Sequence, residues 1–317
     1  MPNERAVIAG AGYMFKRWLP DLNQENVQVV GLVELDTKKA HRLAREYGLK
    51  AQIGKDLKAV LSKTKPDFVI DLTVPQAHCS VTCTSLRAGC PVIGEKPMAA
   101  TMNQAGKMVK TSEATGKLYM VSQSRRYFPW NEQMQRIIQS GKIGDVTEII
   151  CAYYMAHHCT DFRAQMPSPL LVDMAIHHFD LARYLTGLDA EAVYAKEFNP
   201  RGSWFAGNAA TTCIFEMSNG VIFTYLGNMC AEGSSTTYNG NWRIIGTKGT
   251  VICEQDQPPI AEVAARKQDS LLSTKQLKLP KPKEKYIQWH VALRQMLQFL
   301  RTGKKPQTEC HDNIKSL

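Results

Sequence analysis

Four polar side chains gather on one stripe of a predicted helix that covers residues 170–187. The segment reads LLVDMAIHHFDLARYLTG, with apolar residues on both sides of the stripe. On a helix with about 100° per residue, the four lie within about 60° of one another: Asp173, His177, Asp180 and Tyr184. Because the flanking surface is apolar, we expect this stripe to face the protein interior rather than open water.

The spacing of Asp173 and His177 suits a general base and its supporting carboxylate. A carboxylate one turn before a histidine can accept the ring N–H, fix the tautomer and raise the basicity of the ring. The same pair could serve only the helix, where it would contribute about 0.2–0.5 kcal/mol. A third alternative is a metal site, but His178 points about 100° away from His177, so one helix cannot direct both rings at one ion. We expect no metal here, and the first two alternatives stay open.

The sequence also predicts where this helix begins and ends. Ser168 suits the N-cap, Pro169 suits the first helical position, and Gly187 stands just past the last turn. We therefore expect one regular α-helix between these residues.

Composition places the chain among ordinary globular proteins. Its 317 residues are 44% hydrophobic and 21% charged, and this length is enough for two domains of about 150 residues each. No apolar run reaches the roughly 18 residues of a membrane span. The N-terminus begins with charged residues and leads directly into a strand pattern, unlike a signal peptide. We expect a cytoplasmic protein with no membrane partner.

Cysteine and charge patterns narrow the partner classes further. The nine cysteines are scattered and form no Cys-x-x-Cys pair, which is typical of reduced thiols in a reducing compartment. The formal net charge is +10, but the basic residues are spread along the whole chain. The densest lysine run, 275–285, contains two prolines and is predicted to be an exposed loop. We therefore expect no nucleic-acid partner.

Strand and helix patterns alternate through the first part of the chain. The strand-like runs are the AVIA run before Gly10 and segments 27–35, 67–73, 90–94 and 117–121. Helical patterns separate them, one running to Leu22 and the others at 38–48, 55–62, 77–88 and 101–115. Such alternation predicts a parallel sheet covered by helices on both faces.

A glycine turn follows the first strand. Gly10 and Gly12 would let a pyrophosphate approach the backbone amides of Tyr13 and Met14, where the next helix begins. The G-x-G-x-x-G fingerprint is incomplete, because its third glycine would fall at Phe15. A bulky ring there should displace or redirect the helix. A glycine turn without a ligand is the alternative.

Glu34 ends the second strand-like run, where an acid can bind ribose hydroxyls. Its charge would repel a 2′-phosphate, so the sequence favours NAD over NADP. Lys38 and Lys39 lie close enough to weaken that preference.

Two further motifs indicate the family. Glu95-Lys96-Pro97 follows the strand-like run at 90–94, and the segment TVPQAH occupies 73–78. With Asp173 and His177, these motifs make the chain resemble the Gfo/Idh/MocA oxidoreductases. The resemblance covers nearly the whole chain and includes RRYFP at 125–129, SGKIGDV at 140–146 and IIGTKGTV at 244–251.

The resemblance implies roles for particular residues. Lys96 would hydrogen-bond the reacting oxygen and stabilise its developing charge. His177 would take the hydroxyl proton, with Asp173 orienting the ring or contacting the sugar. The Lys96-Pro97 bond is often cis in this family. Besides the glycine turn and Glu34, the implied cofactor contacts are Thr73, Pro75, His78, Glu95 and Lys96.

The second part of the chain changes to alternating strand patterns, at 146–155, 192–198, 210–217, 221–229 and 241–246. The predicted fold is α/β: a Rossmann-type doubly wound parallel sheet at 1–123, and an α+β domain with a large, open, mostly antiparallel sheet at 124–317. The resemblance implies that one face of that sheet contacts other subunits, in a homodimer or homotetramer. An amphipathic helix is predicted at 286–303, and packing of this C-terminal helix back on the first domain is left open. In relatives a following helix packs on the first domain. Whether the chain ends naturally at Leu317 stays open.

Residues that would distinguish substrates lie in segment 157–168 and on the sheet. Arg163 and Asp161 could hold sugar hydroxyls or a carboxylate, and His178 and Trp204 could also reach the substrate. The expected function is hydride transfer between a nicotinamide cofactor and a secondary alcohol or ketone of a sugar, polyol or inositol. The alternatives are an NAD-retaining glycosidase or epimerase and a non-catalytic nucleotide-binding regulator. Asp180 and Tyr184 match no family catalytic position, and we expect them to support the helix.

Overall fold

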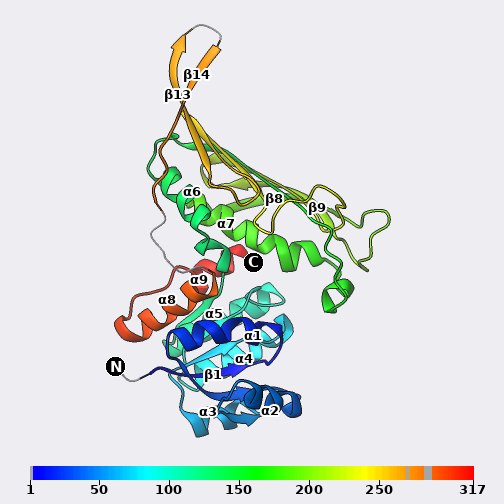
Figure 1. The fold of residues 1–317 in the computed structure, drawn as a ribbon, viewed down its shortest axis with the longest axis vertical. Helices are drawn as coiled ribbons and strands as arrows, with labels where there is room; N and C mark the ends of the chain where they lie inside the picture. The colour runs from blue at the N-terminus through cyan, green and yellow to red at the C-terminus, as the bar shows by residue number, and fades with distance from the viewer. Residues whose placement is uncertain (1–2, 269–270, 282–287) are drawn as a thin grey trace. The chain divides into compact units, whose positions relative to one another are not determined.

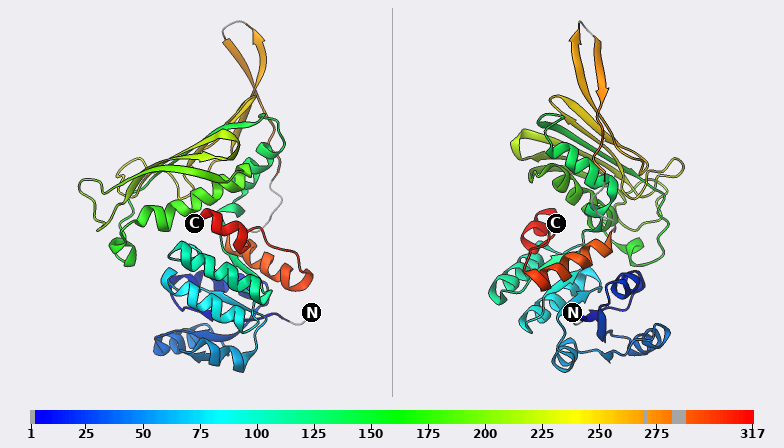
Figure 2. Two further views of the ribbon diagram at one scale, coloured as in Figure 1. Left: turned by 180° about the vertical axis from the view of Figure 1, so that it is seen from behind. Right: turned by 60° about the vertical axis from the view of Figure 1, so that its left-hand side comes forward.

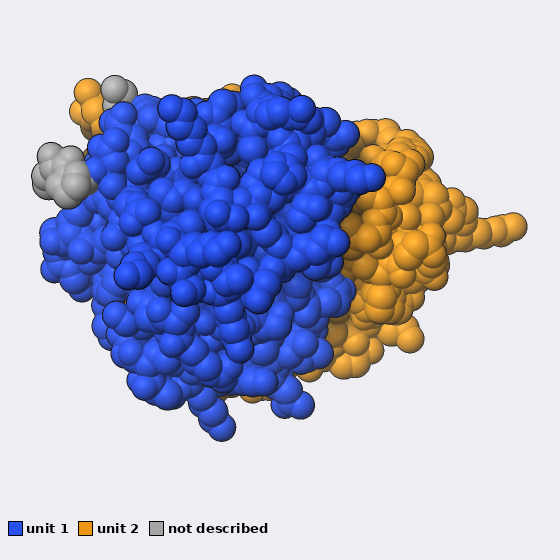
Figure 3. Space-filling model, turned by 90° about the horizontal axis from the view of Figure 1, so that it is seen from below, with its two compact units in different colours: residues 1–124, 288–317 blue, residues 125–287 orange. Residues whose placement is uncertain are grey.

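The computed structural model describes residues 3–268, 271–281 and 288–317. The chain forms two compact units, which Figure 3 colours separately: unit 1 contains Met1–Ser124 and Gln288–Leu317, and unit 2 contains Arg125–Ile287. The expected boundary at 123/124 differs from this division by one residue. Residues 288–317 belong to unit 1. The sequence analysis counted them in the second domain but left open that the C-terminal helix packs back on the first.

Unit 1 is built on a six-stranded parallel sheet in the order β3-β2-β1-β4-β5-β6 (Figure 1). Its strands are β1 (Arg5–Ala9), β2 (Gln28–Val33), β3 (Gln52–Gly54), β4 (Phe68–Asp71), β5 (Val92–Gly94) and β6 (Tyr119–Val121). This order confirms the predicted doubly wound fold. The sequence analysis missed β3, because three residues without a fully buried side chain carry almost no strand pattern.

Helices cover both faces of this sheet (Figure 2). The helices are α1 (Tyr13–Gln24), α2 (Thr37–Glu46), α3 (Leu57–Thr64), α4 (Pro75–Arg87), α5 (Met102–Thr115), α8 (Trp289–Thr302) and α9 (Cys310–Asn313). Side-chain N-caps start four of them, since Asp36, Asp56, Thr101 and Glu309 each accept a hydrogen bond from a backbone N–H in the first turn. Helices α3, α4 and α5 pack together with β1, β4 and β5 in one apolar core.

Helix α8 packs against α1 within unit 1. The buried ring of His290 on α8 lies between two carboxylates of α1, with Nδ1 3.1 Å from Asp21 and Nε2 2.7 Å from Glu25. The chain therefore returns to the Rossmann unit after the second unit is complete. The helix predicted at 286–303 begins at Trp289, and residues 286–287 lie outside the described residues.

Unit 2 contains an eight-stranded sheet in the order β14-β13-β12-β11-β7-β10-β9-β8. Its strands are β7 (Val146–Tyr154), β8 (Ala190–Phe198), β9 (Ala210–Met217), β10 (Val221–Asn228), β11 (Asn241–Gly246), β12 (Gly249–Cys253), β13 (Ile260–Gln268) and β14 (Leu271–Gln276). Every neighbouring pair is antiparallel except β7 and β10, so the expected mostly antiparallel sheet is confirmed.

The hairpin of β13 and β14 projects from the rest of this sheet (Figure 1). The sequence analysis did not predict it, and β14 enters the segment 275–285 that was expected to be a loop. Residues 282–285 of that segment lie outside the described residues. Polar side chains at 273–276 carry no alternation that would have indicated a strand.

Helices α6 (Pro129–Gln139) and α7 (Ile176–Thr186) cover one face of the sheet of unit 2. Side chains of both helices and of β7, β9, β10 and β11 form its apolar core. The described residues also include five short 3₁₀ or π segments: η1 (Ser124–Tyr127), η2 (Phe162–Gln165), η3 (Leu170–Ala175), η4 (Ser218–Gly220) and η5 (Ile314–Ser316). Across the described ranges, no helix has both the length and the hydropathy that a membrane span requires.

Candidate active site

The helix expected at residues 170–187 begins with π-helical winding. Leu170–Ala175 forms the π-turn η3, and α7 follows it from Ile176 to Thr186. The expectation of one regular α-helix was therefore wrong for the first six residues, and the angle of about 100° per residue does not apply to Asp173. The expected N-cap was also wrong, because the Ser168 hydroxyl donates to Glu197. Gly187 ends the helix in the left-handed conformation, as predicted.

Asp173 is held by a charged partner from the preceding segment. Arg163 Nε donates to Asp173 Oδ2 at 2.7 Å, and Arg163 Nη1 donates to Asp161 Oδ2 at 2.6 Å. Both carboxylates therefore share one guanidinium, which stacks over the ring of Phe162 at 4.6 Å. The sequence analysis named all three charged residues but not their pairing. Arg163 and Asp173 are 10 residues apart, and the sequence does not predict the path of the chain between them.

His178 has the surroundings of a structural histidine. Its side chain is fully buried, Nδ1 lies 3.1 Å from the Tyr225 hydroxyl, and Nε2 lies 3.2 Å from the Tyr238 carbonyl. A carbonyl can only accept, so Nε2 carries the hydrogen and Nδ1 accepts from the Tyr225 hydroxyl. Both ring nitrogens are therefore satisfied in a neutral ring. This geometry argues against the substrate contact expected for His178.

Burial of His178 predicts a specific loss of stability in acid. Burial first, and then the charge of Arg125, lower the pKa of His178 to about 3. The unfolded chain takes up this proton below about pH 6.5, whereas the folded protein does not, so stability falls as the pH drops. Between pH 7 and pH 5 we expect this residue to remove about 2 kcal/mol of unfolding free energy. Urea unfolding at both pH values should show a smaller drop for His178→Gln than for the wild type, and equal drops would contradict the assignment.

Asp180 and Tyr184 support the helix, as expected. Arg126 Nε and Nη2 donate to the two carboxylate oxygens of Asp180 at 2.7 and 2.6 Å. The same guanidinium lies 5.6 Å from the centre of the Tyr184 ring, and Gln135 donates to the Tyr184 carbonyl. The pair connects the start of unit 2 to α7.

The glycine turn of unit 1 has the shape of a phosphate-binding turn. Gly10 has φ +93°, and a Cβ there would lie 2.7 Å from the Leu72 carbonyl oxygen, so only glycine fits. A Cβ at Gly12 would meet nothing within 4 Å. Gly12 is the N-cap of α1 and brings no side-chain acceptor to the first-turn amides. The open space and these amides fit a dinucleotide pyrophosphate.

Phe15 does not prevent α1 from packing in unit 1. Its ring is fully buried and packs edge-on against Tyr47, with ring centroids 6.1 Å apart. The position that would hold the third glycine is thus filled by an aromatic contact with the end of α2. In the glycine-rich fingerprint the third glycine allows close packing of the helix on the strand. Here the buried Phe15 ring packs against Tyr47 at that position instead.

Glu34 points toward the glycine turn. Its carboxylate accepts hydrogen bonds from Ala11 N at 2.9 Å and Asp36 N at 3.3 Å. Lys39 Nζ lies 3.7 Å from the same carboxylate. An acid after β2, beside the phosphate-binding turn, is placed to accept hydrogen bonds from the hydroxyls of a ribose.

Asp71 organises the turn that carries Thr73 and Pro75. It is fully buried at the end of β4, and it accepts hydrogen bonds from Thr73 N at 3.1 Å and Thr73 Oγ1 at 2.5 Å. Thr82 of α4 donates to its other oxygen at 3.4 Å. Pro75 is the first residue of α4. The sequence analysis missed Asp71, although an acid that ends a strand just before the TVPQAH segment was a usable signal.

Lys96 follows β5, directly after a buried glutamate that is held by hydrogen bonds. Glu95 is buried and accepts hydrogen bonds from the Trp18 indole at 2.9 Å and from Lys96 N at 3.3 Å. Burial raises the pKa of Glu95, while the hydrogen bond from Trp18 opposes that rise. The Lys96–Pro97 bond is cis, in agreement with the expectation. Trp18 was missed by the sequence analysis, because 77 residues separate it from Glu95.

Trp204 also belongs to a polar cluster of unit 2. Its ring stacks on His158 with centroids 3.7 Å apart, and its indole N–H donates to the His157 carbonyl. His157 also contacts Cys159 Sγ at 3.6 Å and the Tyr238 hydroxyl at 3.0 Å. These contacts join Trp204 to residues 157–159, which precede Arg163 in the chain.

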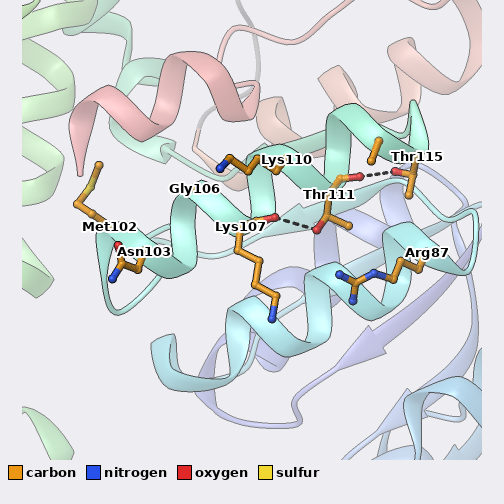
Figure 4. Close-up of a pocket in the computed structure, with 9 residues that line it drawn as sticks. Arg87, Met102, Asn103, Gly106, Lys107, Lys110, Thr111 and Thr115 are labelled. Carbon is orange, nitrogen blue, oxygen red and sulfur yellow. Dashed lines mark hydrogen bonds between the residues drawn. The ribbon is translucent and has the colours of Figure 1, made fainter.

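A separate groove lies between α4 and α5 of unit 1. Its volume is about 610 Å³, and Lys107 of α5 extends toward α4 within it (Figure 4). Three cations contribute to its lining: Arg87, Lys107 and Lys110. None of its lining residues is a site residue expected from the sequence.

One cluster among the described residues could in principle hold a metal ion. The ligand atoms of Glu309, Cys310 and His311 lie within 4.8 Å of one another at α9. The carboxylate of Glu309 caps this short helix by accepting the His311 N–H, so hydrogen bonding accounts for the arrangement. The cluster contains no residue of the 170–187 segment.

Comparisons with known proteins agree with this architecture. Residues 4–123 match the family described as "Oxidoreductase family, NAD-binding Rossmann fold", and residues 131–252 match the GFO/IDH/MocA C-terminal domain. D-glucoside 3-dehydrogenase of Escherichia coli is 28% identical over 63% of this chain and 59% of its own length. Inositol 2-dehydrogenase 4 of Saccharopolyspora erythraea is 26% identical over 69% of this chain and 65% of its own length. The chain thus spans less than two thirds of both relatives.

A solved structure shares the fold of the whole chain. An oxidoreductase from Agrobacterium radiobacter, in complex with NAD+, L-tartaric acid and magnesium, is 19% identical and superposes with a TM-score of 0.84. The match covers 99% of this chain and 93% of that one. The two family models together span most of the sequence, and the chain belongs to the Gfo/Idh/MocA oxidoreductase family.

Proposed function

We propose that this protein is an NAD-dependent dehydrogenase that acts on a secondary alcohol, or the corresponding ketone, of an uncharged sugar, polyol or inositol. The observation that carries the proposal is the presence of Lys96, Asp173 and His177 at the motif positions of the family. Each is on an ordered segment: Lys96 follows Glu95 after β5, Asp173 is bound by Arg163, and His177 is in the first turn of α7.

The proposed roles follow from the chemistry of these groups. NAD, when bound, supplies the hydride acceptor. His177 takes the proton of the substrate hydroxyl as general base. Lys96 donates a hydrogen bond to the reacting oxygen and stabilises its developing negative charge. Arg163 holds Asp173 in one orientation, so that its carboxylate can orient the imidazole or bind a hydroxyl of the sugar.

Cofactor choice depends on Glu34 in this proposal. Its carboxylate lies at the glycine turn, where it would accept hydrogen bonds from ribose hydroxyls and repel a 2′-phosphate. Lys39 is the nearest opposing charge, at 3.7 Å. We expect Glu34→Ala to weaken NAD binding by about tenfold to a hundredfold, because charged hydrogen bonds contribute about 1.5–3 kcal/mol. NADP binding should weaken less or improve. Fluorescence titration with NADH and NADPH measures both, and an unchanged ratio would contradict the role.

The charge balance around Arg163 favours an uncharged substrate. Asp161 and Asp173 together bring two negative charges to the single positive charge of Arg163, so the three residues carry a net negative charge. Burial lowers the pKa of the neighbouring His157, which keeps that ring neutral. A sugar acid would meet repulsion at this group, whereas hydroxyls can donate to the carboxylates.

Substituting Arg163 tests the dependence of Asp173 on its partner. We expect Arg163→Leu to lower kcat/KM by about tenfold to a hundredfold, because the charge-assisted bonds that hold Asp173 are lost. Arg163→Lys should be intermediate, since an ammonium cannot match the forked guanidinium. Steady-state kinetics at several pH values measure the effect. Wild-type kcat/KM in the leucine variant would show that Asp173 needs no partner.

The proposed reaction is tested by incubating the protein with NAD and a panel of sugars, polyols and inositols. NADH absorbance should rise with at least one uncharged member and less with the corresponding acids. If NAD binds but no NADH forms with any member, the dehydrogenase proposal fails. Bound NADH that appears and disappears within one turnover would instead identify an NAD-retaining glycosidase or epimerase.

We also propose that the protein is a homodimer or homotetramer. The face of β8, β9 and β10 that carries Tyr194 exposes apolar side chains, and Tyr194 itself is 69% exposed. Phe198, Ile214 and Ile222 extend this surface. Exposed apolar surface of this kind is typical of subunit interfaces. Light scattering on Tyr194→Lys and Ile214→Lys variants should report a smaller mass than that of the wild type.

A further inference from the structure

His78 on α4 is a buried histidine with two acceptors. Its side chain is 1% exposed, Nδ1 lies 2.9 Å from the Pro97 carbonyl, and Nε2 lies 3.0 Å from the Thr73 carbonyl. A carbonyl oxygen can only accept a hydrogen bond. A neutral ring carries one N–H, so one of its nitrogens would face a carbonyl lone pair to lone pair. Only the imidazolium donates to both oxygens.

His178 provides the contrasting case in the same chain. It is also buried, but one of its partners is the Tyr225 hydroxyl, which can donate, and the other is the Tyr238 carbonyl. One ring proton therefore satisfies His178, whereas His78 needs two. The difference comes from the partners and not from the degree of burial.

Charged groups around His78 can stabilise a cation there. Asp71 on β4 and Glu95 after β5 are both buried, and each is attracted electrostatically to His78. Burial raises the pKa of both carboxyls, and the positive charge of His78 opposes that rise. Lys96 is the other cation that acts on Glu95.

The two carbonyls that His78 contacts belong to different segments. Thr73 lies in the turn after β4, and Pro97 directly follows Lys96. A ring that donates to both ties the turn to the lysine segment. Because its side chain is almost fully buried, His78 is better suited to this positioning role than to the direct cofactor contact expected from the sequence.

We propose that His78 is a clamp that donates from both ring nitrogens, holds the Lys96 segment against the turn after β4 and so positions Lys96. The protonation state and the clamp stand on the geometry alone. The catalytic consequence rests on the proposed function, in which Lys96 contacts the reacting oxygen.

The protonation state is tested by nitrogen NMR on the full chain labelled with 15N-histidine. At neutral pH, His78 should show two protonated ring nitrogens, and His178, the matched control, should show one. His78→Gln assigns the signal. A single protonated nitrogen on His78 overturns the proposal, whether or not any substrate is found. If His78→Gln does not fold, specific labelling of the wild type assigns the signal instead.

The positioning role is tested with the same variant. Amide hydrogen exchange in segment 95–99 should be faster in His78→Gln, because one carbonyl loses its donor. If turnover is measurable, kcat should fall about tenfold to a hundredfold, with little change in the Kd of NAD. Unchanged exchange overturns the clamp, and an unchanged kcat overturns its catalytic consequence.

Discussion

Replacing Lys96 with alanine is expected to lower kcat by about a hundredfold to a thousandfold, the usual effect of removing a donor that stabilises a developing oxyanion. The Kd of NAD should change little, because the glycine turn and Glu34 bind the distant part of the dinucleotide in our proposal. Stopped-flow or steady-state NADH formation measures kcat, and fluorescence titration measures the Kd. The change removes an ammonium without disturbing the backbone contact of Lys96 N with Glu95.

Lys107→Ala is the matched control for this experiment. It removes another lysine of unit 1, one that lines the groove between α4 and α5. Its kcat should equal that of the wild type. If Lys96→Ala retains full turnover with the same substrate, Lys96 does not contact the reacting oxygen, and the proposed mechanism is wrong.

Asp180→Asn is expected to give the largest loss of stability. Arg126 and Asp180 have side chains that are only 5% and 1% exposed, and they form two hydrogen bonds. Removing one charge leaves the other buried without compensation, which costs about 3–5 kcal/mol. Denaturant unfolding should show this loss as a lower midpoint of the transition. The loss should be independent of any substrate or cofactor.

Two controls distinguish burial from charge as the cause. Glu132→Gln removes a partner of Arg136 in a half-exposed i,i+4 pair, where the expected change is below about 1 kcal/mol. The double variant Arg126→Met with Asp180→Leu removes both buried charges and should recover much of the stability lost by Asp180→Asn. If Asp180→Asn is no more damaging than Glu132→Gln, the pair does not stabilise unit 2 as described.

Local sequence patterns were sufficient for most elements of both units. The alternation of strand and helix patterns predicted the parallel sheet of unit 1, and period-two alternation predicted five strands of unit 2. These patterns succeed because residues close in the sequence already determine which face of an element is buried. Short or polar elements failed for the same reason: β3 is too short to show a period, and β14 has a polar sequence.

The 170–187 segment shows where local reasoning ends. The sequence predicted a helix with Asp173 and His177 near one another, and it predicted the stop at Gly187. It did not reveal the π-turn of Leu170–Ala175, because helical sequences differ little between α and π winding. Asp173 lies within the π-helical segment, and its partner Arg163 lies outside the helix.

The sequence by itself determined the family, the fold class and the residue types available for chemistry, since these depend on motifs and periodicity. Only the tertiary structure decided what each side chain contacts. His177 and His178 are adjacent and identical in type, yet the partners that bury His178 are 47 and 60 residues away. His78 likewise meets one carbonyl 5 residues away and another 19 residues away. Donor and acceptor partners set the protonation and the role of a histidine, and folding alone brings such partners together.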